Sequence, residues 1–130
     1  MIKRILIVDD SAIARKMMRS CIPKDQGYEF TEASNGDEGV QLFTEFRPDV
    51  TFLDITMPVM DGITCLEAIK KIDESAVVVM CTADVQPKSV LKATGLGALM
   101  VVKKPPTKEG ILDVLNKVNK MLEETESGTP

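Results

Sequence analysis

The chain of 130 residues contains no histidine and no tryptophan, and only 4% of its residues are aromatic. Without histidine it cannot build the Ser-His or Cys-His pairs that activate nucleophiles in many hydrolases. It also cannot carry a phosphohistidine of its own. Any imidazole in its chemistry must therefore come from a partner, and its core must consist mainly of Val, Ile, Leu, Met and Ala.

Cysteine is scarce, and its placement argues against a structural role. Cys21, Cys65 and Cys81 are odd in number and widely spaced, and they form no C-x-x-C pair. This pattern predicts free thiols in a reducing compartment rather than a disulfide or a zinc site.

Long apolar runs and dense positive charge are also missing. No run approaches the roughly 20 residues that span a bilayer, and the first residues lead straight into a strand pattern rather than a signal peptide. The net charge is −4, with Lys and Arg spread along the chain, which argues against a nucleic-acid surface. We therefore expect a cytoplasmic protein that binds neither nucleic acid nor membrane.

Apolar runs alternate with amphipathic stretches along the whole chain. The runs predict strands at residues 4–8, 28–33, 49–53, 76–81 and 98–102. The start signals of the intervening helices are Ser11, Asn35-Gly36, Gly62, Pro87 and Thr107. Five such units predict an α/β fold, a doubly wound five-stranded parallel sheet of order 2-1-3-4-5 with five helices, which is the flavodoxin-like arrangement. We expect one domain at residues 1–122 and a flexible tail at 123–130.

Acidic residues end two of the predicted strands. Asp9 and Asp10 follow the first strand, and Asp54 follows the third. In the 2-1-3-4-5 order the ligand crevice lies between the carboxyl ends of those two strands, so the three acids should meet. Crowded carboxylates repel one another, and oxygen ligands without His or thiolate suit Mg²⁺. The glycine-rich loop of a nucleotide site is absent.

Two further polar residues follow the fourth and fifth strands. Thr82 offers a hydroxyl and Lys104 an ammonium group. Together with an aspartate and Mg²⁺, these groups are what phosphoryl transfer to a carboxylate needs, because positioning and charge neutralisation supply most of its catalysis.

Four motifs now stand in order along the chain: Asp9-Asp10, Asp54 in the segment 53–62, Thr82-Ala83 and Lys104-Pro105. They resemble the CheY-like receiver domain of two-component response regulators, and the resemblance covers about residues 3–122. It implies that Asp54 is the phosphoacceptor and that Thr82 and Lys104 hold the phosphoryl group.

The resemblance also implies a metal site and partners. Asp10, Asp54 and the backbone carbonyl of Thr56 would bind Mg²⁺ directly, and Asp9 mostly through water. The phosphoryl donor would be a phosphohistidine on a sensor histidine kinase. A downstream protein would read the face formed by the fourth helix, the fifth strand and the fifth helix, and a phosphatase is a possible further partner. Lys104 is chosen over Lys103 because it directly precedes proline, where the family often has a cis peptide bond.

The chain departs from the family pattern in places. Most receivers carry an aromatic residue three positions before the lysine, where this chain has Val101. The position after Lys104-Pro105 is Pro106, which should stiffen the start of the last helix. Thr56 and Asp84 occupy positions that tune phosphate lifetime, and Asp84 is hypothesised to orient water or a phosphatase.

Several alternatives stay open at this point. The protein is interpreted as a stand-alone, chemotaxis-type switch that catalyses only its own phosphorylation and dephosphorylation, and is otherwise not an enzyme. It could instead be a receiver cut from a longer regulator such as a transcription factor, or a degenerate receiver. A haloacid-dehalogenase-type phosphatase needs a second Asp two residues after the nucleophile, where this chain has Thr56. In the plainest interpretation Asp9 and Asp10 are helix caps.

Overall fold

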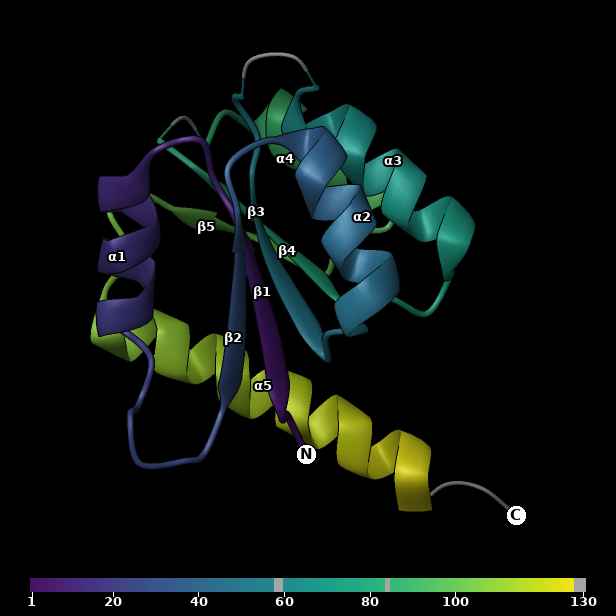
Figure 1. The fold of residues 1–130 in the computed structure, drawn as a ribbon. Helices are drawn as coiled ribbons and strands as arrows, with labels where there is room; N and C mark the ends of the chain where they lie inside the picture. Colours follow the sequence, from purple (N-terminus) through teal and green to yellow (C-terminus); the bar gives the residue numbers. More distant parts are fainter. Residues whose placement is uncertain (58–59, 84, 128–130) are drawn as a thin grey trace.

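The structure is a computed structural model that describes residues 1–57, 60–83 and 85–127, with side chains described through residue 124. Asp84, Pro58 and Val59 lie outside the described residues. Strands and helices alternate along the described chain (Figure 1). The elements are β1 (Arg4–Val8), α1 (Ala12–Ser20), β2 (Glu29–Ala33), α2 (Gly36–Phe46), β3 (Val50–Asp54), α3 (Gly62–Ile72), β4 (Val78–Thr82), α4 (Pro87–Gly95), β5 (Met100–Lys103) and α5 (Lys108–Ser127).

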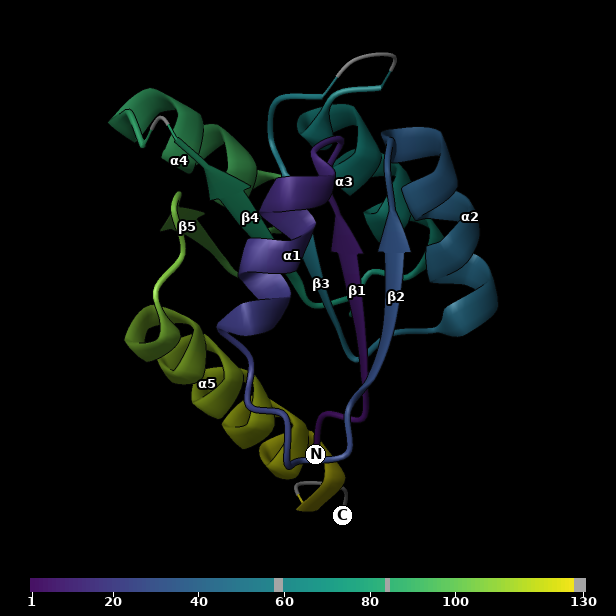
Figure 2. The same ribbon diagram turned by 60° about the vertical axis from the view of Figure 1, so that its left-hand side comes forward.

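The strands form one parallel sheet of order β2-β1-β3-β4-β5, which confirms the predicted fold. Helices α1 and α5 cover one face, and α2, α3 and α4 cover the other (Figures 1 and 2). Each face has its own apolar core, one with Met18 and Ile111 from its helices and the other with Phe43 and Leu66. All strands therefore point their carboxyl ends toward the same rim of the sheet.

Helix starts follow the capping signals of the sequence. The Ser11 side chain accepts a hydrogen bond from the Ala14 N–H, and Asn35 caps α2 in the same way. Helix α3 begins at Gly62 itself, since Asp61 supplies its cap. Pro87 occupies the first turn of α4, as predicted.

Some boundaries differ from the prediction. Strands β4 and β5 each begin two residues later than expected, at Val78 and Met100. Helix α5 continues through Ser127, past the predicted end at residue 122, because the glutamates at 123 and 124 are good helix formers. The domain boundary itself stays a prediction.

The three cysteines are free thiols, as predicted, with Cys65 and Cys81 buried and Cys21 partly buried. Over the described ranges, no helix combines the length and the apolar character that crossing a bilayer requires.

Candidate functional site

Three carboxylates meet at the rim between β1 and β3. Asp9 follows β1 directly, and Asp54 is the last residue of the neighbouring β3, one position after the Val8–Leu53 pair. Carboxylate oxygens of Asp9, Asp10 and Asp54 all lie within 4.8 Å of one another. Asp9 and Asp54 are buried, whereas Asp10 is exposed. The predicted convergence of the acids is therefore confirmed.

Lys104 follows β5, an edge strand of the sheet, and its side chain extends to this cluster. Its Nζ lies 2.6 Å from Asp9 Oδ2 and 3.3 Å from Asp54 Oδ1. The Lys104–Pro105 peptide bond is cis. The neighbouring Lys103 is exposed, so the lysine directly before proline is the one that faces the acids.

The pKa values of Asp54 and Lys104 are both raised in this site. Burial raises the pKa of Asp54, the nearby Asp9 raises it further, and Lys104 and the Thr56 backbone N–H oppose the shift without cancelling it. Burial lowers the pKa of Lys104, but its hydrogen bond to Asp9 and the attraction of Asp54 outweigh this effect and raise it overall. Lys104 thus pairs with two of the three carboxylates, and a divalent cation fits this oxygen-only donor set.

Thr82 and Thr56 complete the surroundings of Asp54. Thr82 ends β4, is 5% exposed, and accepts a hydrogen bond on its carbonyl from the Lys104 N–H at 2.8 Å. Cys81, the residue before it, is paired with Asp54 in the sheet. Thr56 donates its backbone N–H to the Asp54 carboxylate. The catalytic role of Thr82 and the role of the Thr56 carbonyl as a metal ligand stay predictions.

Val101 lies on β5, opposite Met80 of β4. It is partly buried and packs against the apolar cluster that α4 shares through Ala93. Where most receivers carry an aromatic ring, this chain therefore has a small aliphatic side chain resting on the core. Asp84, the other variable position, lies outside the described residues.

Two contributors to the site were missed from sequence. Gly62, named above only as a helix start and as part of the segment 53–62, packs so closely on β3 that a Cβ there would overlap the Asp54 carbonyl oxygen, and its place in an Asp-Gly pair after Asp54 was an available signal for this close approach. Arg15 donates from Nη1 to the Asp9 carbonyl oxygen at 2.6 Å. No spacing rule relates a helix arginine to a preceding backbone carbonyl, so this contact had no sequence signal.

Comparison with known protein families shows which family the chain belongs to. The family profile for the response regulator receiver domain matches residues 5–116. The chain belongs to this family. Receiver domains are phosphorylation-dependent signalling domains that bind Mg²⁺ at an acidic pocket, and the aspartate cluster fits that pocket.

Among receiver proteins the chain closely resembles CheY. It is 43% identical to the chemotaxis protein CheY of Thermotoga maritima over 119 residues, covering 91% of this chain and 98% of that protein. It is 42% identical to CheY of Bacillus subtilis over 117 residues, 90% of this chain and 98% of that protein. The CheX–CheY–BeF₃–Mg²⁺ complex of Borrelia burgdorferi aligns with a TM-score of 0.83 at 33% identity, covering 89% of this chain and 88% of that one.

Proposed function

We propose that this receiver domain accepts a phosphoryl group on Asp54 in a Mg²⁺-dependent reaction and relays the signal by protein contact, as a CheY-type chemotaxis regulator. The observation that carries the proposal is the position of the Asp54 carboxylate, buried at the end of β3 close to two other carboxylates and 3.3 Å from the Lys104 ammonium. The near-complete coverage of the CheY relatives supports the chemotaxis assignment over a receiver that belongs to a transcription factor.

The proposed ligands of Mg²⁺ are Asp10, Asp54 and the Thr56 carbonyl, with Asp9 acting through water. The hydrogen bonds of Asp9 support this division. Its Oδ1 accepts the Ser11 N–H at 2.9 Å and its Oδ2 accepts Lys104 Nζ, whereas Asp10 is exposed and open to an arriving ion. When bound, the ion neutralises the acids and draws in phosphoryl oxygens.

In the reaction, an Asp54 oxygen forms a bond to phosphorus while the P–N bond of a phosphohistidine on the kinase breaks. Lys104 already contacts Asp54, so its ammonium is placed to pair with a phosphoryl oxygen once the transfer is complete. The Thr82 hydroxyl, at the end of the adjacent strand, would bond a second oxygen. Both residues act by position and charge, which is the main source of catalysis in phosphoryl transfer.

The added charge must then change a surface that a partner reads. We place this surface on α4, β5 and α5, and the donor is a sensor histidine kinase. Because Val101 has no ring to turn inward, the change would proceed through the backbone after Thr82 and through α4. A two-state shift of this kind requires only that phosphorylation favours one arrangement over the other.

The test is intact mass after incubation with Mg²⁺ and acetyl phosphate. We expect one phosphoryl adduct in the native protein and none in Asp54→Asn. Asp113→Asn makes the same chemical change at an exposed position on α5 and should keep the adduct. An adduct that persists in Asp54→Asn would place the acceptor elsewhere and overturn the proposal.

A further inference from the structure

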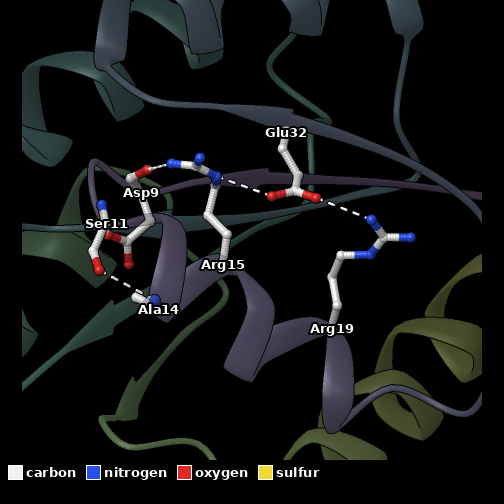
Figure 3. A network of polar contacts seen from close by, with 6 residues as sticks. All are labelled: Asp9, Ser11, Ala14, Arg15, Arg19 and Glu32. Atoms are coloured by element: carbon white, nitrogen blue, oxygen red, sulfur yellow. Dashed lines mark hydrogen bonds and ion pairs between the residues drawn. The ribbon is translucent and has the colours of Figure 1, made fainter.

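Arg15 connects the acidic rim to the edge of the sheet. Figure 3 shows its guanidinium lying between the Asp9 carbonyl oxygen, which it meets at 2.6 Å, and Glu32 on β2. Its Nε donates to Glu32 Oε1 at 2.9 Å. The side chain is only 17% exposed, and the backbone N–H of Arg15 also donates to the Ser11 carbonyl at 3.0 Å. Arg15 thus fastens the loop after β1 by its backbone and by its side chain.

Arg15 contacts Asp9 through the backbone carbonyl of Asp9, and other partners bind the remaining polar groups of this residue. The Asp9 N–H donates to the Ala33 carbonyl at 3.0 Å, and its two carboxylate oxygens accept from Ser11 and Lys104. The carbonyl belongs to the peptide that links Asp9 to Asp10. Since a peptide is planar, fixing this oxygen fixes the plane from which the Asp10 backbone continues. The direction of the Asp10 side chain is therefore tied to Arg15.

We infer that Arg15 is a positioning residue for the cation site, holding the Asp9–Asp10 peptide so that the Asp10 carboxylate faces Asp54, with Glu32 orienting the guanidinium. The inference rests on the proposed function, because it takes Asp10 as a Mg²⁺ ligand. Groups that orient metal ligands from behind commonly change metal affinity by about 10- to 100-fold when removed.

Arg19 provides a matched control within the same network. It pairs with the other oxygen of Glu32, at 3.0 Å from Oε2, and its guanidinium lies over the Phe30 ring at 4.5 Å. Figure 3 shows Arg19 one helical turn further from Asp9 than Arg15. The side-chain contacts that the structure describes for Arg19 involve Glu32 and Phe30 and do not reach Asp9. A change at Arg19 disturbs the ion pair while leaving the Asp9 carbonyl in place.

The loss of the Arg15 charge and the loss of its support for the Asp9–Asp10 peptide predict opposite changes in Mg²⁺ affinity, so the experiment can distinguish them. Removing a cation near an acidic cluster should by itself strengthen Mg²⁺ binding, because less repulsion opposes the incoming ion. Losing the support of the Asp9–Asp10 peptide should weaken it. An affinity that falls in Arg15→Met cannot arise from the change in net charge.

The experiment titrates the full chain with Mg²⁺ alone and follows backbone amide NMR shifts in the native protein, Arg15→Met, Arg15→Lys, Arg19→Met and Glu32→Gln. We expect the dissociation constant to rise about tenfold in Arg15→Met. It should rise less in Arg15→Lys, which keeps one donor, and in Glu32→Gln, which keeps the guanidinium. Arg19→Met should stay within about twofold of the native protein. Urea unfolding in EDTA, run in parallel at the temperature of the titration, shows whether each variant is folded there.

The outcomes separate this inference from the proposed function. Mg²⁺ affinity that is unchanged or higher in Arg15→Met overturns the inference while leaving the proposed function standing. An equal loss in Arg15→Met and Arg19→Met also overturns it, since the ion pair alone would then be responsible. A native protein that takes up no Mg²⁺ overturns the proposed function itself. If Arg15→Met does not fold, Arg15→Lys decides, because native affinity in that variant together with native affinity in Glu32→Gln contradicts the inference.

Discussion

The rim between β1 and β3 and the face around α4 and β5 are built differently. At the rim, β3 is buried along its whole length and Asp9 has hydrogen bonds at its amide, its carbonyl and both carboxylate oxygens. Around α4, no side chain within the described part of the chain caps the helix start, the helix's buried residue is Ala93, and β5 is at best partly buried. The first region holds atoms in fixed positions, and the second is lightly packed, so it can rearrange at low energetic cost. This is the division of labour that a switch requires.

Two glycine substitutions test this contrast with the largest expected effect. A methyl group at Gly62 would overlap the Asp54 carbonyl oxygen, whereas one at Gly95, the last residue of α4, would meet nothing within 4 Å. We expect Gly62→Ala to lower the free energy of unfolding by about 3 kcal/mol, since the backbone of β3 must shift. Gly95→Ala should raise it by about 0.5 kcal/mol, by restricting the unfolded chain. Urea unfolding measures both, and equal effects at the two sites would contradict the contrast.

A pair of valines compares packing in the same two regions. Val79 on β4 is fully buried in the core that α1 and α5 cover, while Val101 on β5 is partly buried against the α4 side. Val79→Ala should cost about 2 kcal/mol, because it removes buried methyl groups and leaves a cavity. Val101→Ala should cost about 1 kcal/mol or less. A larger loss at Val101, measured by thermal or urea unfolding, would show that the α4–β5 face is as firmly packed as the core.

The close approach of the carboxylates predicts that the charged Asp54 lowers the free energy of unfolding of the metal-free protein. The pKa of Asp54 is raised chiefly by burial and then by Asp9, so its charged form destabilises the folded state at neutral pH. Asp54→Asn should therefore stabilise the metal-free protein, on the order of 1 kcal/mol.

The pH dependence of this effect has a definite sign. The folded state binds the Asp54 proton more tightly than the unfolded state, so the native protein recovers stability relative to the variant as pH falls through the raised pKa. Mg²⁺ should shrink the gap by stabilising the native protein alone. Urea unfolding with EDTA and with Mg²⁺, at neutral and acidic pH, checks both statements, and a variant that is less stable at neutral pH in EDTA would contradict them.

Features that follow from strand order or from local capping could be predicted from the sequence. The meeting of Asp9, Asp10, Asp54 and Lys104 was predictable because strand ends in a parallel sheet share one rim, and the strands were visible as apolar runs. Helix starts were predictable from Ser11 and its counterparts, because capping is local.

Contacts that depend on tertiary geometry were not predictable. The bond from Arg15 to the Asp9 carbonyl and its ion pair with Glu32 join elements that only the folded chain brings together. The length of α5 was underestimated for a different reason, since an acidic stretch is equally compatible with a tail and with an exposed helix end.

The smallest predicted effect concerns a polar atom near the amino end of β3, away from the rim. Among the described residues, Thr51 Oγ1 is the buried side-chain oxygen that has no hydrogen-bond partner, and it lies on the same strand as Asp54. Burying an unpaired hydroxyl costs free energy that an isosteric methyl group does not. Thr51→Val should therefore raise the free energy of unfolding by about 0.5–1 kcal/mol, without changing Mg²⁺ affinity or phosphorylation of Asp54. Urea unfolding and Mg²⁺ titration check the two parts. A destabilised Thr51→Val would show that the hydroxyl is hydrogen-bonded in the folded protein. Hydrogen-bonded polar groups would then extend beyond the rim, and the distinction between a site of fixed polar contacts and an apolar body of the sheet would be weaker.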